Sequence, residues 1–357
     1  MKCSVVILNW NGEATLRQFL PSVLQHTQLP DVEIVVADNG STDTSLDFLR
    51  TQPVRIISLD KNYGFAEGYN RAIAQVDSEY VVLLNSDVEV TPNWLSSMLT
   101  YMDTHPETLA AQPKVLSWHS KQLYDKGQIP AVTFEHAGAA GGMMDVLGYP
   151  YCRGRLMSHL QEDHGQYDTV EPIFWATGAC LFVRTQVYKA LGGLDPLFFA
   201  HQEEIDFCWR IHANFHSPLA ISEASNSLKE ASIICLPEAT VYHVGGATLG
   251  YESPRKTFLN FRNNLLMLRK NLPACHRWWI MFVRFFLDYV AALQMLLTGQ
   301  KANAVAVFKA RVEYHRTARG LMGNGPISNS EAGKRQAFSL LARRSIVLDF
   351  YLRKKHK

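Results

Sequence analysis

Short apolar runs alternate with longer amphipathic segments through residues 1–90, and this alternation limits the fold more than any other feature of the chain. The apolar runs are Cys3–Leu8, Val32–Ala37, Val54–Leu59 and Tyr80–Leu84. The segments between them are a helical pattern from about Glu13 to His26, polar Thr42–Arg50 and helical Phe65–Val76. Runs rich in Val, Ile and Leu, separated by helix-length segments, indicate βαβ units and a parallel sheet buried on both faces. The sequence therefore predicts an α/β fold with a Rossmann-like, mainly parallel sheet flanked by helices.

Polar residues follow three of these runs at the point where each predicted strand ends. They are Asn9-Trp10-Asn11-Gly12, Asp38-Asn39-Gly40 and Asn85-Ser86-Asp87. In open α/β sheets, ligands bind at the carboxyl ends of the strands, near a change in strand order. We therefore expect these segments to contribute to a binding site at that edge of the sheet.

Asp87 and His243 are candidate metal ligands. A carboxylate at the end of a strand can hold Mg²⁺ or Mn²⁺ against the two phosphates of a nucleotide diphosphate. His243 ends another strand-like run and precedes Gly245-Gly246, so its imidazole is a candidate ligand for the same metal. Both residues also have a plain structural interpretation, because Asn/Ser/Asp clusters commonly form turns and a single histidine is commonly structural.

Asp38 and the segment Asn62–Asn70 are candidates for binding the rest of a nucleotide. The Asp38 carboxylate can accept a hydrogen bond from a base N–H or a ribose hydroxyl, although capping and turn formation are the alternative. Gly64 and Gly68 lie near a predicted helix start, where the backbone can approach a ligand closely. Their spacing is not that of a glycine-rich phosphate-binding fingerprint.

The acidic residues Glu203, Glu204 and Asp206 follow the aromatic segment Leu197-Phe198-Phe199. Desolvation and mutual repulsion raise the pKa of carboxyl groups packed among aromatic rings, and a raised pKa suits a general base that works near neutral pH. Glu203 or Glu204 is therefore a candidate base for an acceptor hydroxyl. The alternative is an acidic helix start in which Asp206 and Arg210 form an i,i+4 ion pair.

The rest of the chain divides into a weakly periodic middle and a helical end. Residues 117–170 are rich in Gly, His, Tyr and Pro and predict loops and short strands, and Ile173–Arg184 predicts another strand. The small, polar stretch Ser217–Ser232 predicts an inserted surface loop or a short helix. Beyond Pro254 the pattern is helical.

Charge is divided unequally between the two parts of the chain. Residues 1–254 hold 15 Lys and Arg against 29 Asp and Glu, a balance of −14, whereas residues 255–357 hold 20 against 4, a balance of +16. We therefore treat these two ranges as separate domains. The basic part suits nucleic acid, an anionic membrane surface or phosphorylated ligands, and a merely solvated basic surface is the alternative.

The segment Trp278–Leu297 approaches membrane-spanning length but carries Arg284 and Asp288 at helical i,i+4 spacing. Each charge costs roughly 2.5–3.5 kcal/mol at the centre of a bilayer, so a spanning helix is disfavoured. Two interpretations stay open, an interfacial helix with an aromatic face in the lipid boundary and a plain packing helix.

The cysteines and the N-terminus predict a cytosolic protein. The six cysteines are scattered without a C-x-x-C pair, so they indicate neither a zinc site nor a disulfide framework. The first apolar run ends at polar Asn9 and Asn11, so it is too short for the apolar region of a secretory signal. The basic C-terminal part would place such a protein at the inner face of the cell membrane if it binds lipid.

In their order along the chain, these segments resemble the family 2 glycosyltransferases with the GT-A fold, especially bacterial rhamnosyltransferase-like members that build surface polysaccharides. The resemblance covers roughly residues 3–270 and rests on the order and spacing of the motifs more than on any one of them. The motifs are VVILNWNG, VVADNGSTD, NYGFAEGYNRAI, VVLLNSDVEV, ATGACLFVR, GGLDPLFFAHQEEIDFCWR, LPEATVYHVGG and LNFRNNLL.

The resemblance implies a role for each candidate residue. It implies Asp87, the last position of the family's D-x-D motif, as metal ligand, with His243 joining the metal or the diphosphate. It implies Glu204 as the base and Glu203 as its acidic neighbour, with Asp206 as an alternative. Glu204 is one methylene longer than the Asp that many relatives have. The nucleotide-binding residues are Asn9, Asn11, Asp38, Asn62, Gly64, Gly68, Asn70, Asn85, Ser86 and Arg262.

The implied function is an inverting, metal-dependent transferase of hexosyl or rhamnosyl type. It moves a sugar from a dTDP-, UDP- or GDP-linked donor to a glycan or lipid-linked acceptor in surface polysaccharide or glycolipid synthesis. We expect Mg²⁺ or Mn²⁺ as cofactor, peripheral membrane contact through residues 255–357 and no nucleic-acid partner. A non-catalytic module that binds a sugar nucleotide or glycan is the alternative. An oxidoreductase or pyrophosphorylase is disfavoured, because the first strand leads into Asn-Trp-Asn-Gly rather than a glycine-rich phosphate loop.

Overall fold

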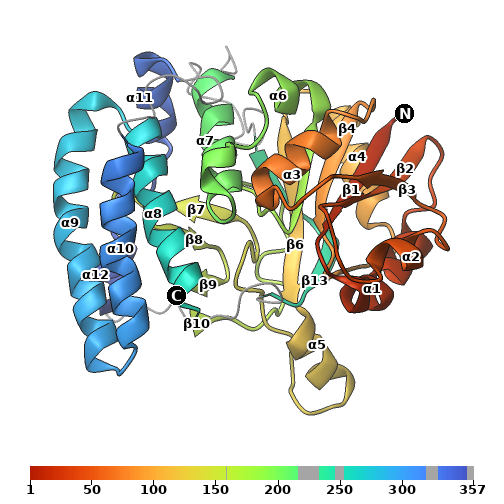
Figure 1. The fold of residues 1–357 in the computed structure, drawn as a ribbon, viewed down its shortest axis with the longest axis horizontal. Helices are drawn as coiled ribbons and strands as arrows, with labels where there is room; N and C mark the ends of the chain where they lie inside the picture. The colour runs from red at the N-terminus through yellow and green to blue at the C-terminus, as the bar shows by residue number, and fades with distance from the viewer. Residues whose placement is uncertain (158, 216–232, 246–252, 319–328, 352–357) are drawn as a thin grey trace.

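The computed structural model describes residues 1–157, 159–215, 233–245, 253–318 and 329–351 of the chain. The predicted insertion Ser217–Ser232 lies outside the described residues. Figure 1 shows a central sheet with helices against both faces and a group of long helices at one end of the molecule.

The central sheet has nine strands, in the order β11-β13-β6-β12-β4-β1-β2-β3, with β5 paired to β13. The strands are β1 Cys3–Asn9, β2 Val32–Asp38, β3 Arg55–Ser58, β4 Tyr80–Asn85, β5 Val88–Val90, β6 Ala110–Ser117, β11 Glu171–Pro172, β12 Cys180–Arg184 and β13 Ile233–His243. Strands β4, β1, β2 and β3 are parallel to one another, as are β6 and β13. Strand β12 runs antiparallel to β4 and β6 on either side of it. The predicted α/β fold is confirmed, and strand order and direction change at β12.

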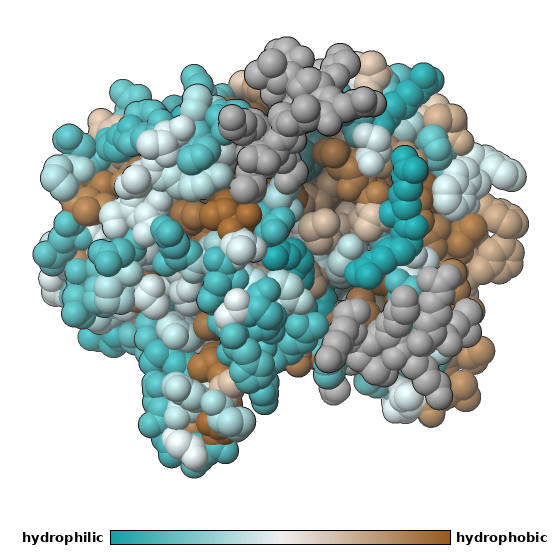
Figure 2. Space-filling view, turned by 180° about the vertical axis from the view of Figure 1, so that it is seen from behind, coloured by the Kyte–Doolittle hydropathy of each residue, from teal (hydrophilic) through white to brown (hydrophobic). Residues whose placement is uncertain are grey.

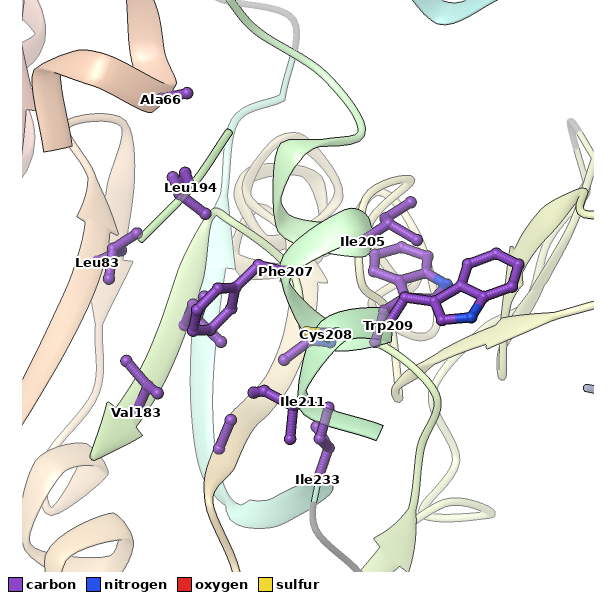
Figure 3. Close-up of a cluster of buried hydrophobic side chains, with 14 of the residues drawn as sticks. Ala66, Leu83, Val183, Leu194, Ile205, Phe207, Cys208, Trp209, Ile211 and Ile233 are labelled. Atoms are coloured by element: carbon purple, nitrogen blue, oxygen red, sulfur yellow. Dashed lines mark hydrogen bonds between the residues drawn. The ribbon is translucent and has the colours of Figure 1, made fainter. Parts of the chain in front are cut away.

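Helices bury the central sheet on both faces, as predicted. They are α1 Glu13–His26, α2 Ser45–Leu49, α3 Gly64–Ile73, α4 Trp94–Thr104, α6 Thr185–Ala190 and α7 Glu203–Asn214. Because side chains alternate along a strand, Val6 of β1 packs in the core with α3 and α7, whereas Ile7 packs in the core with α1 and α4. Figure 3 shows the first of these cores, where Phe207 of α7 points toward Leu83 and Val183 of the sheet.

The predicted strand Ile173–Arg184 is wrong in its first half. The chain turns before Cys180, whose amide donates to the Thr177 carbonyl over 3.2 Å, and only the residues from Cys180 onward join β12. Upstream of the turn, the amides of Phe174 and Trp175 donate to the Gly142 carbonyl instead. A one-dimensional apolar pattern does not distinguish such a turn from a continuous strand.

Residues 117–170 form loops and short strands, as predicted, together with an unpredicted helix, α5 Trp118–Asp125. A second, antiparallel sheet has the order β10-β9-β8-β7. Its strands are β7 Gly142–Met144, β8 Pro150–Cys152, β9 Arg155–Leu156 and β10 His159–Leu160. This sheet lies between the central sheet and the C-terminal helices (Figure 1).

The described chain beyond Pro254 is helical, as predicted. Its helices are α8 Pro254–Asn271, α9 Ala274–Leu297, α10 Lys301–Thr317, α11 Glu331–Ser339 and α12 Ile346–Tyr351. Helix α9 lies farthest from the central sheet (Figure 1). By length and composition, it is the one helix of the described chain that could cross a membrane. The division into domains 1–254 and 255–357 stays a prediction.

Candidate active site

The ends of β4 and β13 bring Asp87 and His243 together from distant parts of the sequence. Asp87 Oδ1 lies 3.2 Å from His243 Nε2, and Asn85 Nδ2 lies 3.4 Å from the same ring nitrogen. The contact follows from the sheet. After the turn at Ser86, β5 pairs with β13 so that Val88 stands opposite His243. The two residues predicted as metal ligands therefore meet, and both are buried.

Glu135 is a second carboxylate in contact with His243. Its Oε2 lies 3.5 Å from His243 Nδ1, on the opposite side of the ring from Asp87, and its side chain is buried. Burial alone lowers the pKa of His243, but the carboxylates of Asp87 and Glu135 outweigh burial and raise the pKa to about 10. A carboxylate behind an imidazole fixes the orientation of the ring, as it does for metal-bound histidines.

Asp87 and His243 fit a divalent cation that is shared with a diphosphate. Ligands of Mg²⁺ lie about 2.0–2.1 Å from the ion in octahedral geometry, so neighbouring ligands are about 3 Å apart. The 3.2 Å between Asp87 Oδ1 and His243 Nε2 matches such an edge. Among the residues that the structure describes, no group of three or more His, Cys, Asp or Glu side chains could hold a metal unaided. Substrate phosphates and water would have to supply the other ligands, which is the usual arrangement for Mg²⁺ with nucleotides.

Asn9, Asp38 and Ser41 form a hydrogen-bonded network at the ends of β1 and β2. Asn9 Nδ2 donates to Asp38 Oδ1 over 3.0 Å and to Ser41 Oγ over 3.2 Å. The Ser41 amide donates to Asp38 Oδ2 over 3.0 Å, and Asn11 Oδ1 accepts from the Thr42 amide over 2.7 Å. Within the described chain, the buried Asn9 Oδ1 has no hydrogen-bond partner, so it can accept a hydrogen bond from a ligand.

The loop between β3 and α3 uses its own polar side chains to hold its shape. Asn62 Oδ1 accepts from the Gly64 amide over 2.8 Å and from Asn39 Nδ2 over 3.2 Å. Asn70 Nδ2 donates to the Leu194 carbonyl over 2.7 Å. The proposed contribution of Asn62 and Asn70 to nucleotide binding stays a prediction, since these contacts position the loop and α3.

Glycines 64 and 68 are required by packing within the protein. Gly64 has a φ of 78°, and a Cβ on it would lie 2.5 Å from the Phe199 ring. A Cβ on Gly68 would lie 2.9 Å from a methyl carbon of Leu8 in β1. The close approach that the sequence predicts at Gly64 and Gly68 is therefore made to protein atoms in this structure.

Helix α7 begins with the carboxyl groups of Glu203 and Glu204. The Oε2 atom of each is buried and, within the described residues, has no hydrogen-bond partner. Burial raises the pKa of Glu204 to about 7. Burial and repulsion from Glu204 raise the pKa of Glu203 well above its ordinary value. Burial therefore favours the protonated form of both carboxyl groups, and the pKa of Glu204 suits a general base that works near neutral pH.

The loop that enters β12 connects Glu204 with the end of β4. The Cβ of Glu204 lies 3.7 Å from the position of a Cβ built on Gly178. The next residue, Ala179, accepts a hydrogen bond from the Asn85 amide over 2.9 Å. Asn85 ends β4 and stands two residues before Asp87. The candidate base and the candidate metal ligands therefore lie at the same edge of the central sheet.

Asn263 of α8 holds the loop that leads into α7. Phe199, His201 and Gln202 in this loop have φ angles of 62°, 70° and 75°, in the left-handed region that costs non-glycine residues free energy. Asn263 Nδ2 lies 2.9, 2.8 and 2.8 Å from three carbonyl oxygens of the loop, those of Phe198, Ala200 and His201. The start of α7, with its two glutamates, is therefore fixed by a residue of the C-terminal region.

Asp206 is fully buried and already paired with cations. Its Oδ2 accepts from Arg210 Nε and from Lys270 Nζ, both over 2.8 Å, and its Oδ1 accepts from Asn271 Nδ2 over 2.7 Å. Burial disfavours its charge, but Lys270 and Arg210 outweigh burial and lower the pKa of Asp206. The predicted ion pair with Arg210 is confirmed. Asp206 has a structural role in these contacts, which makes it a weaker base candidate than Glu204.

Arg262, Asn263 and Glu135 show where sequence reasoning falls short. Arg262 Nη2 donates to the Leu197 and Phe198 carbonyls, each over 3.2 Å, so in this structure it supports the loop before α7. The sequence assigned no role to Asn263, although an Asn pair inside an apolar helix signals buried partners. Glu135 lies in a weakly periodic segment that offers no signal at all.

The sequence is similar to those of known glycosyltransferases. Residues 4–137 match the family described as "Glycosyl transferase family 2". The N-acetylglucosaminyl-diphospho-decaprenol L-rhamnosyltransferase of Mycobacterium tuberculosis is 27% identical over 215 residues, which cover 57% of this chain and 67% of that protein. The uncharacterized protein y4gI of Sinorhizobium fredii is 27% identical over 287 residues, 75% of this chain, but the match spans only 27% of that longer relative.

A solved structure with a similar fold is the mannosyltransferase PcManGT of Pyrobaculum calidifontis in complex with GDP-Man and Mn²⁺. Its TM-score is 0.50 at 12% sequence identity, and the alignment covers 99% of this chain and 88% of that one. At this identity the likeness concerns the fold alone. Residues 4–137 therefore match glycosyl transferase family 2, and the sheet with its flanking helices has the GT-A fold of the solved transferase.

Proposed function

We propose that the protein transfers a hexosyl or rhamnosyl group from a nucleoside diphosphate sugar to an acceptor hydroxyl, with inversion, in surface polysaccharide or glycolipid synthesis. One observation carries the proposal. Glu204, a carboxyl group with a pKa of about 7, lies at the same sheet edge as the Asp87–His243 pair. Transfer from a diphosphate to a hydroxyl needs both a base for the nucleophile and compensation for the charge of the leaving group.

The proposed reaction is a single displacement. The ionised Glu204 carboxylate takes the proton of the acceptor hydroxyl while the hydroxyl oxygen forms a bond to the anomeric carbon. The bond from that carbon to the diphosphate oxygen breaks, and its electron pair leaves with the diphosphate. Because the nucleophile enters opposite the leaving group, the configuration inverts. Burial and repulsion from Glu204 raise the pKa of Glu203, which disfavours a second negative charge beside the base.

Asp87 and His243 would hold the Mg²⁺ or Mn²⁺ that the fold implies, and Glu135 would orient the imidazole. A bound divalent cation neutralises the negative charge that develops on the departing diphosphate. The Mn²⁺ in the Pyrobaculum mannosyltransferase complex supports a divalent cation here. The use of Mg²⁺ or Mn²⁺ by this protein is part of the proposal.

Asn9 and Asp38 are proposed to bind the nucleoside of a dTDP-, UDP- or GDP-linked donor. The buried Asn9 Oδ1 suits a base N–H or a ribose hydroxyl, because that contact would satisfy an otherwise unpaired acceptor. The name of the Mycobacterium relative supports a rhamnosyl donor and a lipid-linked acceptor as the first pair to test. The cytosolic location stays a prediction.

A screen of nucleotide sugars tests the proposal. Purified protein is incubated with each donor, with Mn²⁺ or Mg²⁺, and with a prenyl-diphosphate-linked sugar, and the product is identified by mass spectrometry. We expect metal-dependent transfer from one donor, starting with dTDP-rhamnose, and no transfer by Glu204→Gln. Donor binding without transfer or hydrolysis under any of these conditions would favour the non-catalytic binding module instead.

A further inference from the structure

We propose that the outer face of α9 and α10 is a docking surface for an anionic membrane, with α9 lying in the plane of the lipid–water interface. The surface, called the aromatic face below, consists of Trp278, Phe282, Phe285, Phe286, Tyr289 and Phe308. The inference is independent of the proposed transfer reaction, since it concerns residues at the opposite end of the molecule from β1, β2 and β3 (Figure 1).

The distribution of side chains on helix α9 is the reverse of that on a typical surface helix, because its charged residues Arg284 and Asp288 are buried and its large apolar residues are exposed. Its buried positions are Ile280, Arg284, Asp288 and Ala292, at a spacing of four that places them on one side. Large apolar side chains occupy the outer side, with Trp278 76%, Phe286 54% and Leu297 80% exposed. A helix that points its charges inward and its aromatic rings outward is expected to meet an apolar partner there.

The inward charges of α9 are held by the rest of the protein. Arg284 Nη1 donates to Asn264 Oδ1 of α8 over 2.6 Å and to the Leu147 carbonyl over 3.2 Å. Asp288 Oδ2 accepts from Arg311 Nη2 of α10 over 2.8 Å. A membrane-spanning position for α9 would break these contacts and expose both charges to lipid. The geometry therefore favours an interfacial helix that remains attached to α8 and α10.

The exposed rings of the aromatic face form one continuous series of contacts. The ring centroids of Trp278 and Phe282 are 5.9 Å apart, those of Phe282 and Phe286 5.1 Å, and those of Phe286 and Phe285 5.3 Å. The series continues from Phe285 to Tyr289 at 4.9 Å and from Tyr289 to Phe308 of α10 at 5.0 Å. Aromatic rings of this kind concentrate at the headgroup level of bilayers. Figure 2, a view from behind, shows apolar residues gathered at this end of the molecule.

The charge around the aromatic face is positive. Within residues 253–318, the exposed charged residues Arg255, Lys301, Lys309 and Arg316 are basic, and one acidic side chain, Glu313, is 40% exposed and lies 3.7 Å from Arg316. Lys309, Arg316 and Glu313 also line a shallow groove with apolar Phe258, Val305 and Val312. Cations beside exposed apolar side chains match a phospholipid, which presents a phosphate above its acyl chains.

This charge distribution favours lipid over a second copy of the chain as the partner. Two copies joined through the aromatic face would bring Lys301, Lys309 and Arg316 of both molecules close together, and within residues 253–318 only Glu313 of each copy would oppose these cations. Like charges across an interface oppose association, whereas anionic headgroups neutralise the same cations. Charge complementarity therefore selects an anionic lipid surface.

Vesicle sedimentation of the full chain tests the proposal. The vesicles contain phosphatidylcholine alone or mixed with phosphatidylglycerol. We expect the protein to pellet with the anionic vesicles, less so as salt is added, and poorly with the neutral ones. The triple variant Trp278→Ser, Phe282→Ser, Phe286→Ser should partition at least about tenfold more weakly, because it loses the largest apolar groups of the aromatic face.

A matched control removes exposed apolar side chains elsewhere. The double variant Leu123→Ser, Tyr124→Ser alters α5 and should pellet like the wild type. Thermal melts of both variants check that each remains folded, as expected for changes at exposed positions. Equal pelleting of the wild type and the triple variant, or of the wild type with neutral and anionic vesicles, would overturn the proposal. A wild-type dimer that the triple variant converts to a monomer, without vesicle binding, would assign the aromatic face to a second copy.

Discussion

Replacing Asn263 should lower kcat as well as the stability of the protein. The Asn263 amide has two hydrogens, which it shares among three loop carbonyls at 2.8–2.9 Å, and its Oδ1 accepts from Arg262 Nε over 2.8 Å. A net value of about 1 kcal/mol for each amide hydrogen and about 1.5 kcal/mol for the contact with the guanidinium gives a loss of about 3–4 kcal/mol for Asn263→Ala. The loop also stores strain at Phe199, His201 and Gln202, each worth roughly 1–3 kcal/mol, which favours relaxation once the anchor is gone.

Relaxation of this loop moves the start of α7 and with it Glu204. A displacement of about 1 Å at a reacting group costs roughly 100-fold in rate, so kcat should fall by about that factor. Asn263→Asp, which keeps the shape but removes the donors, should be at least as harmful. The assay measures kcat with the donor found in the screen, donor affinity by calorimetry, and the melting temperature, which should fall by only a few degrees. Donor affinity should change little, since Asp87 and Asn9 are not touched.

The matched control for Asn263 is Asn214→Ala at the other end of α7. Asn214 Nδ2 donates to the Arg210 carbonyl over 2.9 Å and to Asn329 Oδ1 over 2.7 Å, so this variant loses the two hydrogen bonds donated by its amide. It should lose about 2 kcal/mol of stability while keeping kcat within about threefold, because the loop before α7 is unaffected. The reasoning would be refuted by an Asn263→Ala enzyme with wild-type kcat, or by equal loss of kcat in both variants.

Further predictions concern the three carboxyl groups of Glu204, Asp87 and Glu135. Glu204→Gln should abolish transfer while donor affinity is retained, and transfer at the wild-type rate would move the base elsewhere. The wild-type rate should rise with pH through about 7, where Glu204 ionises, and a flat profile would contradict this assignment. Because burial raises the pKa of Glu204 above its ordinary 4.5, the folded state binds more protons than the unfolded state between these values. The contribution of Glu204 to the free energy of unfolding is therefore present below pH 4.5 and is lost as the pH rises through about 7. Urea titrations at several pH values should show that Glu204→Gln removes this pH-dependent contribution. Asp87→Ala should abolish the Mn²⁺ dependence of nucleotide binding, measured by calorimetry. Glu135→Gln should weaken Mn²⁺ affinity roughly 10–100-fold through loss of His243 orientation.

The sheet could be predicted because the signal of each strand is local. Residues 80–84 are apolar throughout and residues 3–8 are apolar except for Ser4, as a strand buried on both faces requires. The position of β12 between β4 and β6 could not be predicted, because strand pairing is settled by partners far away in the sequence. The turn before Cys180 was missed for a similar reason, since the residues upstream of it, Phe174 and Trp175, donate to Gly142 of the second sheet.

The candidate site could be predicted in part. The sequence was enough to predict that Asn9, Asp38 and Asp87 lie near one another, because the carboxyl ends of neighbouring parallel strands share one edge of the sheet. The roles of Glu135 and Asn263 could not be predicted from the sequence, because each residue acts through a contact that forms only in the folded chain. The same limit applies to α9, whose sequence left two interpretations open until the positions of Arg284 and Asp288 were known.

The central claim is that Asp87, His243 and Glu204 act on one bound donor at the same edge of the central sheet. Anomalous diffraction from crystals grown with Mn²⁺ and a nucleoside diphosphate tests it most directly. The account predicts a manganese peak contacted by Asp87, His243 and the diphosphate, with the Glu204 carboxyl facing the space beside the terminal phosphate. A manganese ion and diphosphate bound elsewhere, or a Glu204 side chain separated from them by the sheet, would contradict it.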